Sequence, residues 1–289
     1  MSKIAIVTDT NSGISPEEAI RYDIHVVPMP FMINGETFYE GINLSQEDFF
    51  IKQREQAEIS TSQPSPDSIL TLWDNLLETY DELVYLPMSS GLSGSCQTAT
   101  MLAMDYEGRV EVVNNQRISV PLVRSILDAK QMAEKGYRAA EIKNFLEEDR
   151  FHTSIYIMVD TLEYLRKGGR ITPSAAALGS LLRIKPVLQI QGEKLDSFAK
   201  ARTVSAAKQT MLHAIISDIT KRFGFSEDGD EFYIDFAYTE CRDAALDFQK
   251  EILQHFPNAE SIISPLALSI ACHIGPGALG IAVTRKNRF

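Results

Sequence analysis

Cysteine is scarce in this sequence of 289 residues. The three cysteines, Cys96, Cys241 and Cys272, are far apart, and none belongs to a C-x-x-C pair. An odd number of cysteines at this spacing predicts neither a disulfide framework nor a zinc site. We therefore expect a protein of a reducing compartment, with the cytoplasm as its location.

A basic surplus and long apolar runs are also missing. The formal net charge is −11 at pH 7, so no excess of lysine and arginine is available to neutralise nucleic-acid phosphates. The opening apolar run meets Asp9 and is too short for the core of a signal peptide. No stretch approaches the roughly 20 apolar residues that span a bilayer. These absences argue against a nucleic-acid partner and against stable membrane insertion.

The common nucleotide-binding motifs do not occur either. The sequence contains no G-x-x-x-x-G-K-[ST] loop, no G-x-G-x-x-G fingerprint and no protein-kinase motif set. We therefore do not expect this chain to bind a nucleotide by itself.

The first half of the sequence alternates strand-like and helix-like segments. KIAIVTD, ELVYLPM and RVEVVNN are apolar runs typical of buried strands, with helical patterns between them. Such alternation predicts an α/β fold with a mostly parallel sheet and flanking helices. The pattern changes near residue 150. We therefore expect two domains, an N-terminal α/β domain over 1–150 and a C-terminal α/β domain over 151–289.

Local signals predict where several elements begin and end. Ser15, Pro16 and Glu18 combine an N-cap, a proline at the first helical position and a capping-box glutamate. Asn34-Gly35 is typical of a hairpin turn. Farther along, the sequence predicts a helix in the Ala- and Leu-rich stretch 174–183, a hairpin around 191–194 and a long helix over roughly 203–223.

Small hydroxyl residues follow one predicted strand, in PMSSGLSGSCQ (87–97). Its centre is one residue short of a G-x-S-x-G nucleophile elbow, because Ser95 stands where the last glycine should be. His273 lies downstream, in the order that α/β-hydrolases use, and Asp235 is one candidate acid. The residues alone leave three interpretations of Ser93 open: a nucleophile, an anion-binding hydroxyl at a helix start, or a plain helix cap.

A second hydroxyl-rich segment is EISTSQPSPDS (58–68). Its prolines predict a rigid extended loop that runs into a helix, in which Thr61 and Ser62 are either capping residues or ligand contacts. Loops that follow different strands of a parallel sheet converge at its carboxyl edge, where ligands bind. On the functional interpretation, this loop meets the Ser93 turn there.

Two later motifs combine glycine with a cation or a histidine. His273 precedes Gly275-Pro276-Gly277, a tight turn that brings backbone close to another group. Leu165–Ile171 reads LRKGGRI, which is either an anion-binding loop or a helix end with its favoured cations and a glycine stop. Lys200 and Arg202 add to the local positive charge.

Taken together, these stretches resemble one family. KIAIVTDTNSGIS, STSQPS, SSGLSGS, YLRKGGRI and HIGPGALG resemble the DegV family in motif, order and spacing over the whole chain. The resemblance implies a two-domain α/β protein that buries one long-chain fatty acid, palmitate- or oleate-like, between its domains. It also implies a bacterial lipid-binding subunit that presents the acid to a separate, ATP-dependent fatty acid kinase, which makes an acyl phosphate for phospholipid synthesis.

The resemblance also assigns roles to residues. The hydroxyls of Thr61 and Ser93 would hold the fatty-acid carboxylate, with the backbone N–H groups of Ser62 and Gly94 and the side chain of His273 as further contacts. Our expected surface for the kinase partner consists of three cations, Arg170, Lys200 and Arg202. No cofactor and no metal are expected, and the chain itself is expected not to be an enzyme. The alternative is a serine hydrolase or acyltransferase that uses Ser93 and His273.

Overall fold

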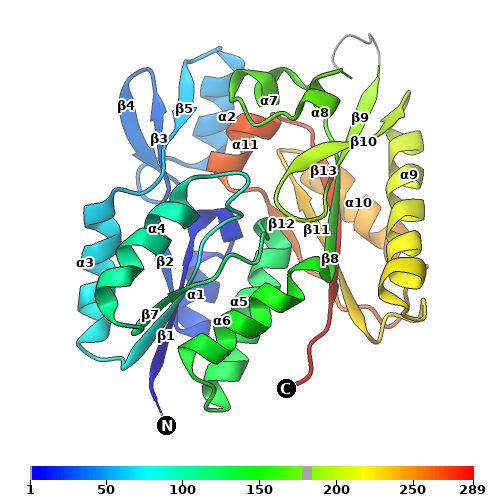
Figure 1. The fold of residues 1–289 in the computed structure, drawn as a ribbon. Helices are drawn as coiled ribbons and strands as arrows, with labels where there is room; N and C mark the ends of the chain where they lie inside the picture. The colour runs from blue at the N-terminus through cyan, green and yellow to red at the C-terminus, as the bar shows by residue number, and fades with distance from the viewer. Residues whose placement is uncertain (1, 178–183) are drawn as a thin grey trace. The chain divides into compact units, whose positions relative to one another are not determined.

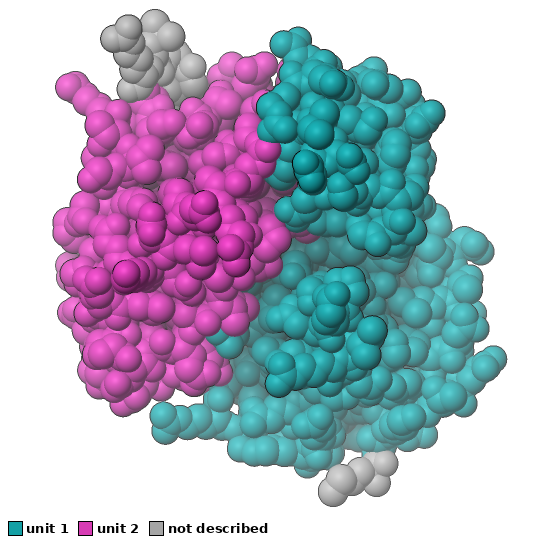
Figure 2. Space-filling view, turned by 180° about the vertical axis from the view of Figure 1, so that it is seen from behind, with its two compact units in different colours: residues 1–150, 287–289 teal, residues 151–286 magenta. Residues whose placement is uncertain are grey.

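The structure is a computed structural model that describes residues 2–177 and 184–289, and the chain divides into two compact units. The first unit comprises residues 1–150 with 287–289, and the second comprises residues 151–286 (Figures 1 and 2). The expected C-terminal domain includes residues 287–289, whereas in the structure these last three residues belong to the first unit.

The first unit is built on a parallel sheet of four strands. β1 (Ile4–Asp9) lies between β2 (Ile24–Val27) and β6 (Glu82–Leu86), and β7 (Val110–Val112) pairs with the other side of β6. All three pairings are parallel, as the alternation of strands and helices predicts. The loops that follow β1, β6 and β7 therefore leave the sheet at one edge.

Helices cover both faces of this sheet (Figure 1). α3 (Pro66–Leu77) and α4 (Ser95–Ala103) pack on one face, and α5 (Ser119–Glu134) and α6 (Ala139–Glu148) pack on the other. Side chains along a strand alternate between the faces, so both faces of β1 and β6 are apolar and buried. α1 (Pro16–Tyr22) begins at Ser15 with the predicted capping box.

A second, smaller sheet belongs to the same unit. The Asn34-Gly35 turn joins β3 (Pro30–Ile33) to β4 (Glu36–Tyr39), which confirms the predicted hairpin. β5 (Ile59–Thr61) pairs with the other side of β3, and α2 (Gln46–Arg54) precedes it. The segment predicted as an extended loop therefore begins as an edge strand, and Thr61 is its last residue.

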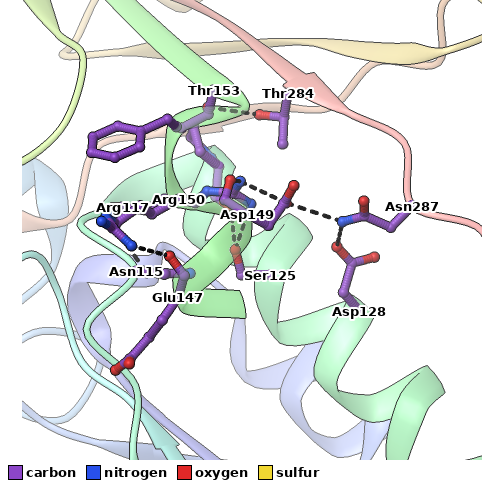
Figure 3. Close-up of polar contacts among 12 residues, drawn as sticks. Asn115, Arg117, Ser125, Asp128, Glu147, Asp149, Arg150, Thr153, Thr284 and Asn287 are labelled. Carbon is purple, nitrogen blue, oxygen red and sulfur yellow. Dashed lines mark hydrogen bonds and ion pairs between the residues drawn. The ribbon is translucent and has the colours of Figure 1, made fainter. Parts of the chain in front are cut away.

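A buried ion pair ties the last residues of the chain to the first unit (Figure 3). Arg117 and Asp149 are 2.9 Å apart, with side chains 0% and 1% exposed. Arg117 also donates to Ser125 Oγ at 2.8 Å. Asn287 donates to Asp149 at 3.1 Å and to Asp128 at 2.8 Å. This network explains why residues 287–289 pack with the first unit.

The second unit contains a six-stranded sheet in the order β10-β9-β8-β13-β11-β12. Its pairings are antiparallel except for the one between β11 and β12. The strands are β8 (Thr153–Met158), β9 (Lys185–Ile190), β10 (Leu195–Ala201), β11 (Phe232–Tyr238), β12 (Ile263–Pro265) and β13 (Leu279–Arg285). β9 and β10 form the hairpin predicted around residues 191–194.

Two helices cover one face of this sheet, α9 (Val204–Ser217) and α10 (Arg242–Leu253). The helix predicted over 203–223 continues past α9 as a π-helix, Asp218–Phe223, which no feature of the sequence pattern indicates. α7 (Glu163–Lys167) and α11 (Leu268–Ile274) are short and contact each other. α8 (Pro173–Ala176) starts the predicted stretch 174–183, of which residues 178–183 lie outside the described residues.

Candidate functional site

Ser93 lies in the turn between β6 and α4, in the first unit. Its Oγ accepts the N–H of Ser95 at 3.2 Å, which leaves the hydroxyl hydrogen able to point to another acceptor. A nucleophile elbow holds its serine in a strained, sharp turn. Ser93 is not among the non-glycine residues of the described chain with positive φ, so the turn lacks that strain. The backbone therefore favours a hydrogen-bonding role over a nucleophilic one.

Thr61 ends β5, at the start of the second hydroxyl-rich segment. Its strand partner is Phe31 of β3, and its side chain is partly buried. The next N–H, that of Ser62, donates to the carbonyl oxygen of Pro30 at 3.1 Å. The Ser62 hydroxyl donates to the carbonyl oxygen of Gln63 at 3.2 Å, so both donors of Ser62 have partners within the chain, and the expected ligand contact of the Ser62 N–H group is not available.

Gln63 brings the two hydroxyl-rich segments together. Its Oε1 accepts a hydrogen bond from the Thr98 hydroxyl, in α4, at 3.1 Å. A Cβ placed on Gly94 would lie 3.4 Å from the same oxygen, which is ordinary van der Waals contact. The residues that follow Thr61 and Ser93 are thus in contact. Gln63 stands inside the STSQPS motif, but the sequence pattern alone predicts no role for it.

A third segment, after β7, supports the Ser93 turn. The N–H of Ser89 donates to the carbonyl oxygen of Arg117 at 2.9 Å, and the Asn114 amide donates to Ser90 Oγ at 2.9 Å. Gln116 and Ser119 both have positive φ, a conformation that side chains rarely adopt. The buried Arg117–Asp149 pair holds this loop, so the turn that carries Ser93 rests on a rigid neighbour.

A cavity of about 470 Å³ also lies in the first unit. Its lining comes from α4, α6 and the end of β7, and it includes Ser90 and Cys96. Neither Thr61 nor Ser93 lines it. This cavity is therefore distinct from the place where the two hydroxyl-rich segments meet.

In the second unit, the two glycine motifs pack against each other. A Cβ on Gly168 would overlap the imidazole ring of His273, and a Cβ on Gly275 would overlap the ring of Tyr164. LRKGGRI is the end of α7: the Gly168 N–H donates to Tyr164 O at 2.9 Å, and Gly169 has φ +68°. The segment thus has the helix-end geometry, and its glycines make room for the histidine motif.

His273 is electrically neutral near pH 7. Burial lowers the pKa of its imidazole to about 4, and the nearby Arg170 guanidinium acts in the same direction. Burial likewise raises the pKa of the Cys272 thiol to about 12. A neutral imidazole can donate one hydrogen bond to an anion, but with a pKa this low it is a weak general base.

The glycine at position 168 makes a sharp test of this packing. Gly168→Ala should destabilise the protein by about 1–3 kcal/mol, because the added methyl group overlaps the His273 ring. Thermal unfolding of the single variant and of Gly168→Ala with His273→Ala measures the effect. The second change should restore much of the lost stability, and an undiminished loss in the double variant would refute the overlap.

The three cations of the expected partner surface are exposed in the second unit. Lys200 lies near the end of β10, an edge strand, and Arg202 follows that strand. Arg170 follows α7, and two residues later the Thr172 hydroxyl donates to Asp196 of β10 at 2.7 Å. Asp196 and Lys200 are four residues apart on that strand, roughly 13 Å. The Arg170 guanidinium itself donates to the carbonyl oxygen of Gly168 at 2.6 Å and acts on the pKa of His273, so its recorded interactions are with the glycine and histidine motifs.

The remaining candidates have structural partners. Asp235, the acid considered for a hydrolase, accepts the N–H of Ile262 at 2.9 Å and is fully buried in β11. Within the described ranges, no group of three or more His, Cys, Asp or Glu residues could hold a metal ion. Over the same ranges, no helix is both long and apolar enough to cross a membrane.

Comparison with protein families gives a match over nearly the whole chain. Residues 3–286 match the family model described as an uncharacterised protein of the DegV family. A DegV domain-containing protein of Clostridium acetobutylicum is 30% identical over 290 residues, which cover 98% of this chain and 99% of the relative. One from Staphylococcus aureus is 32% identical over 293 residues, with 99% of each chain covered.

Solved structures are similar over the same length. A DegV family protein from Thermus thermophilus, described for its fatty acid binding, is 30% identical and superposes with a TM-score of 0.90 over 98% of this chain and 100% of its own. DegV from Bacillus subtilis, described as a fatty acid binding protein, is 26% identical with a TM-score of 0.87 over 99% and 100%.

Proposed function

Since this chain belongs to the DegV family, we propose that it binds one long-chain fatty acid and holds the carboxylate with the hydroxyls of Thr61 and Ser93. Two related structures of 30% and 26% identity are described as fatty-acid-binding proteins, which supports the ligand class. The observation that supports the head-group site is the hydrogen bond from Thr98 to Gln63, which joins the segment after Thr61 to the helix after Ser93.

The hydroxyl groups of Thr61 and Ser93 suit a carboxylate that must stay reactive toward a phosphorus atom. Hydroxyl groups orient a carboxylate while leaving its oxygens nucleophilic, whereas a bidentate arginine would occupy both oxygens and hold them more strongly. Burying a C16–C18 tail removes about 14–16 methylenes from water, each contributing about 0.8 kcal/mol before the costs of binding. The tail therefore supplies most of the affinity, and the head group supplies orientation.

The second part of the proposal concerns the fate of the bound acid. We propose that the carboxylate is presented to a separate ATP-dependent kinase. A carboxylate oxygen attacks the γ-phosphorus, ADP leaves, and an acyl phosphate forms. The absence of nucleotide-binding motifs from the sequence supports a partner that supplies the ATP site. The test is acyl phosphate formation from oleate, ATP and a fatty acid kinase, with and without this protein; equal rates would refute presentation.

A hydrolase is the alternative, and two observations weigh against it. Ser93 lacks the strained backbone of a nucleophile elbow, and His273 is a weak base because burial lowers its pKa to about 4. Turnover of an acyl ester by the purified protein, abolished by Ser93→Ala, would favour the hydrolase.

The proposed partner surface can be tested at Lys200 and Arg202, the exposed cations at the end of β10. Lys200→Glu with Arg202→Glu should slow acyl phosphate formation at least about tenfold, because complementary charge speeds association. Binding of oleate by the variant should be unchanged. Lys221→Glu with Lys250→Glu is the matched control, since it makes the same charge change at exposed positions of the same unit. Equal rates in the two variants would remove these residues from the partner surface.

A further inference from the structure

The carboxylate of Asp9 joins two of the loops at the carboxyl edge of the parallel sheet. Asp9 ends β1 and is fully buried. Its Oδ1 accepts the N–H of Asn11 at 2.9 Å, and its Oδ2 accepts the N–H of Met88 at 2.9 Å. Met88 opens the turn that carries Ser93. The Asp9 side chain therefore connects the loop that follows β1 to the loop that follows β6.

The hydrogen bonds continue from Met88 to Ser93. Ser89 follows Met88, and its carbonyl oxygen accepts the N–H groups of Leu92 at 3.0 Å and of Ser93 at 3.2 Å. Ser93 Oγ then accepts the N–H of Ser95 at the start of α4. A shift of the backbone at Met88 would therefore move the Ser93 hydroxyl.

Among the residues that the structure describes, no cation contributes to the pKa of Asp9, and only hydrogen bonds lower it. The titratable groups that feel the charge of Asp9 are Tyr85 of β6 and Cys96 of α4. Burial raises the pKa of Tyr85 well above its usual range and that of Cys96 to about 11, so both are neutral. Burial raises the pKa of Asp9 itself to about 6, against the opposing effect of the hydrogen bonds from Met88 and Asn11. A buried carboxylate is costly, and its hydrogen bonds from the N–H groups of Met88 and Asn11 and from the Asn11 side chain offset part of that cost.

We propose that Asp9 is the positioning residue of the fatty-acid head-group site, and that its ionised carboxylate fixes the turn that presents Ser93. This inference rests on the proposed function. An ionised carboxylate accepts both N–H groups, whereas a protonated one turns one oxygen into a donor and loses one of the two bonds. The turn should therefore loosen as the pH falls through about 6.

Protonation of Asp9 should have opposite effects on ligand binding, which it weakens, and on the free energy of unfolding, which it raises. A carboxyl group whose pKa is raised on folding favours the folded state below its unfolded pKa, near 3.8, and loses that contribution as the pH rises through about 6. Acidification should thus weaken ligand binding through Asp9 without unfolding the protein through Asp9. If Asp9 had only a structural role, acidification would not weaken ligand binding while leaving the protein folded.

The test measures the binding of radiolabelled oleate between pH 7.5 and pH 5 by the wild type, by Asp9→Asn and by Asp128→Asn. Asp128 is the matched control, because it is a buried carboxyl group of the same unit whose pKa burial also raises to about 6. It accepts a hydrogen bond from Asn287, and the charges that act on it are those of Arg117, Asp149 and Arg124, whereas Asp9 is bonded directly to Met88. The titration of oleate itself is common to all three proteins.

We expect the wild type and Asp128→Asn to lose about tenfold more affinity between pH 7.5 and pH 5 than Asp9→Asn. At pH 7.5, Asp9→Asn should bind about tenfold more weakly than the wild type, because the amide offers one acceptor oxygen instead of two. Parallel pH profiles for the wild type and Asp9→Asn, or equal effects of the two substitutions, would overturn the proposal.

A second measurement separates failure of this inference from failure of the proposed function. In ligand-free wild-type protein, the Met88 amide should lose about tenfold of its hydrogen-exchange protection between pH 7.5 and pH 5, after correction for the intrinsic rate. This readout needs neither a fatty acid nor a variant that folds. Protein that binds no oleate but shows this loss would refute the fatty-acid site alone, and unchanged protection of Met88 would refute the role of Asp9.

Discussion

Replacing Thr61 and Ser93 together by alanine should lower the affinity for oleate about 100-fold while leaving the protein folded. The proposed site offers two hydroxyl donors to one carboxylate, and a hydrogen bond to a charged group contributes about 1.5–3 kcal/mol. Because about 1.4 kcal/mol corresponds to a factor of ten, the loss of two such bonds, partly replaced by water, gives an effect of this size. Titration with radiolabelled oleate measures it.

The matched control is Ser68→Ala with Thr100→Ala. These two residues lie in α3 and α4, the helices that follow the two hydroxyl-rich segments, and the residue types and the changes are the same. Their hydroxyls donate to carbonyl oxygens of their own segments, Ser68 to Ser65 and Thr100 to Cys96, each at 2.8 Å. This control should bind oleate like the wild type. If the Thr61/Ser93 variant also binds like the wild type, the head group lies elsewhere.

Asp149→Ala should give the largest loss of stability, about 3–5 kcal/mol. The substitution leaves the Arg117 guanidinium fully buried without its carboxylate, and an uncompensated buried charge is costly. It also removes an acceptor of the Asn287 amide, which helps to hold the last residues of the chain. Chemical denaturation, followed by the fluorescence of Trp73 in the core of the first unit, measures the change.

Glu163→Ala serves as the comparison for this prediction. Glu163 and Lys167 form an exposed pair at 3.7 Å, with side chains 66% and 74% exposed. Exposed pairs contribute about 0–1 kcal/mol, so this variant should unfold almost like the wild type. Equal losses in Asp149→Ala and Glu163→Ala would show that the buried pair does not stabilise the first unit.

Local sequence signals predicted those parts of the fold that depend on neighbouring residues. The capping box at Ser15 and the Asn34-Gly35 hairpin have the predicted geometry, since turns and caps are set by a few adjacent side chains. β5 was missed because three residues next to Pro64 carry no periodic pattern, and their strand character comes from pairing with β3. The packing of residues 287–289 was missed for the same reason, since it depends on Asp128 and Asp149, more than 130 positions away along the chain.

In the candidate site too, features set by neighbouring residues could be predicted, and contacts between residues far apart in the sequence could not. The carboxyl edge of the parallel sheet, where ligands bind, indicated Ser93, which follows β6. Thr61 ends β5 in the antiparallel sheet, so the parallel-sheet rule does not explain its role, which the resemblance implies. Gln63 and Asp9 were given no part in the site, although both stand inside quoted motifs. Their contacts with Thr98 and Met88 span 35 and 79 positions along the chain, and no local pattern records such a contact. Likewise, the reason for Gly168 became apparent only from the His273 ring beside it.

The claim that the chain holds a free fatty acid is tested most directly by extracting the purified protein with organic solvent and identifying the lipid by mass spectrometry. The intact mass of the denatured protein is measured alongside. We expect close to one long-chain fatty acid per chain, much less in the Thr61/Ser93 variant, and no mass added to the protein. Wild-type protein without fatty acid, or an acyl group covalently attached to Ser93, would contradict it.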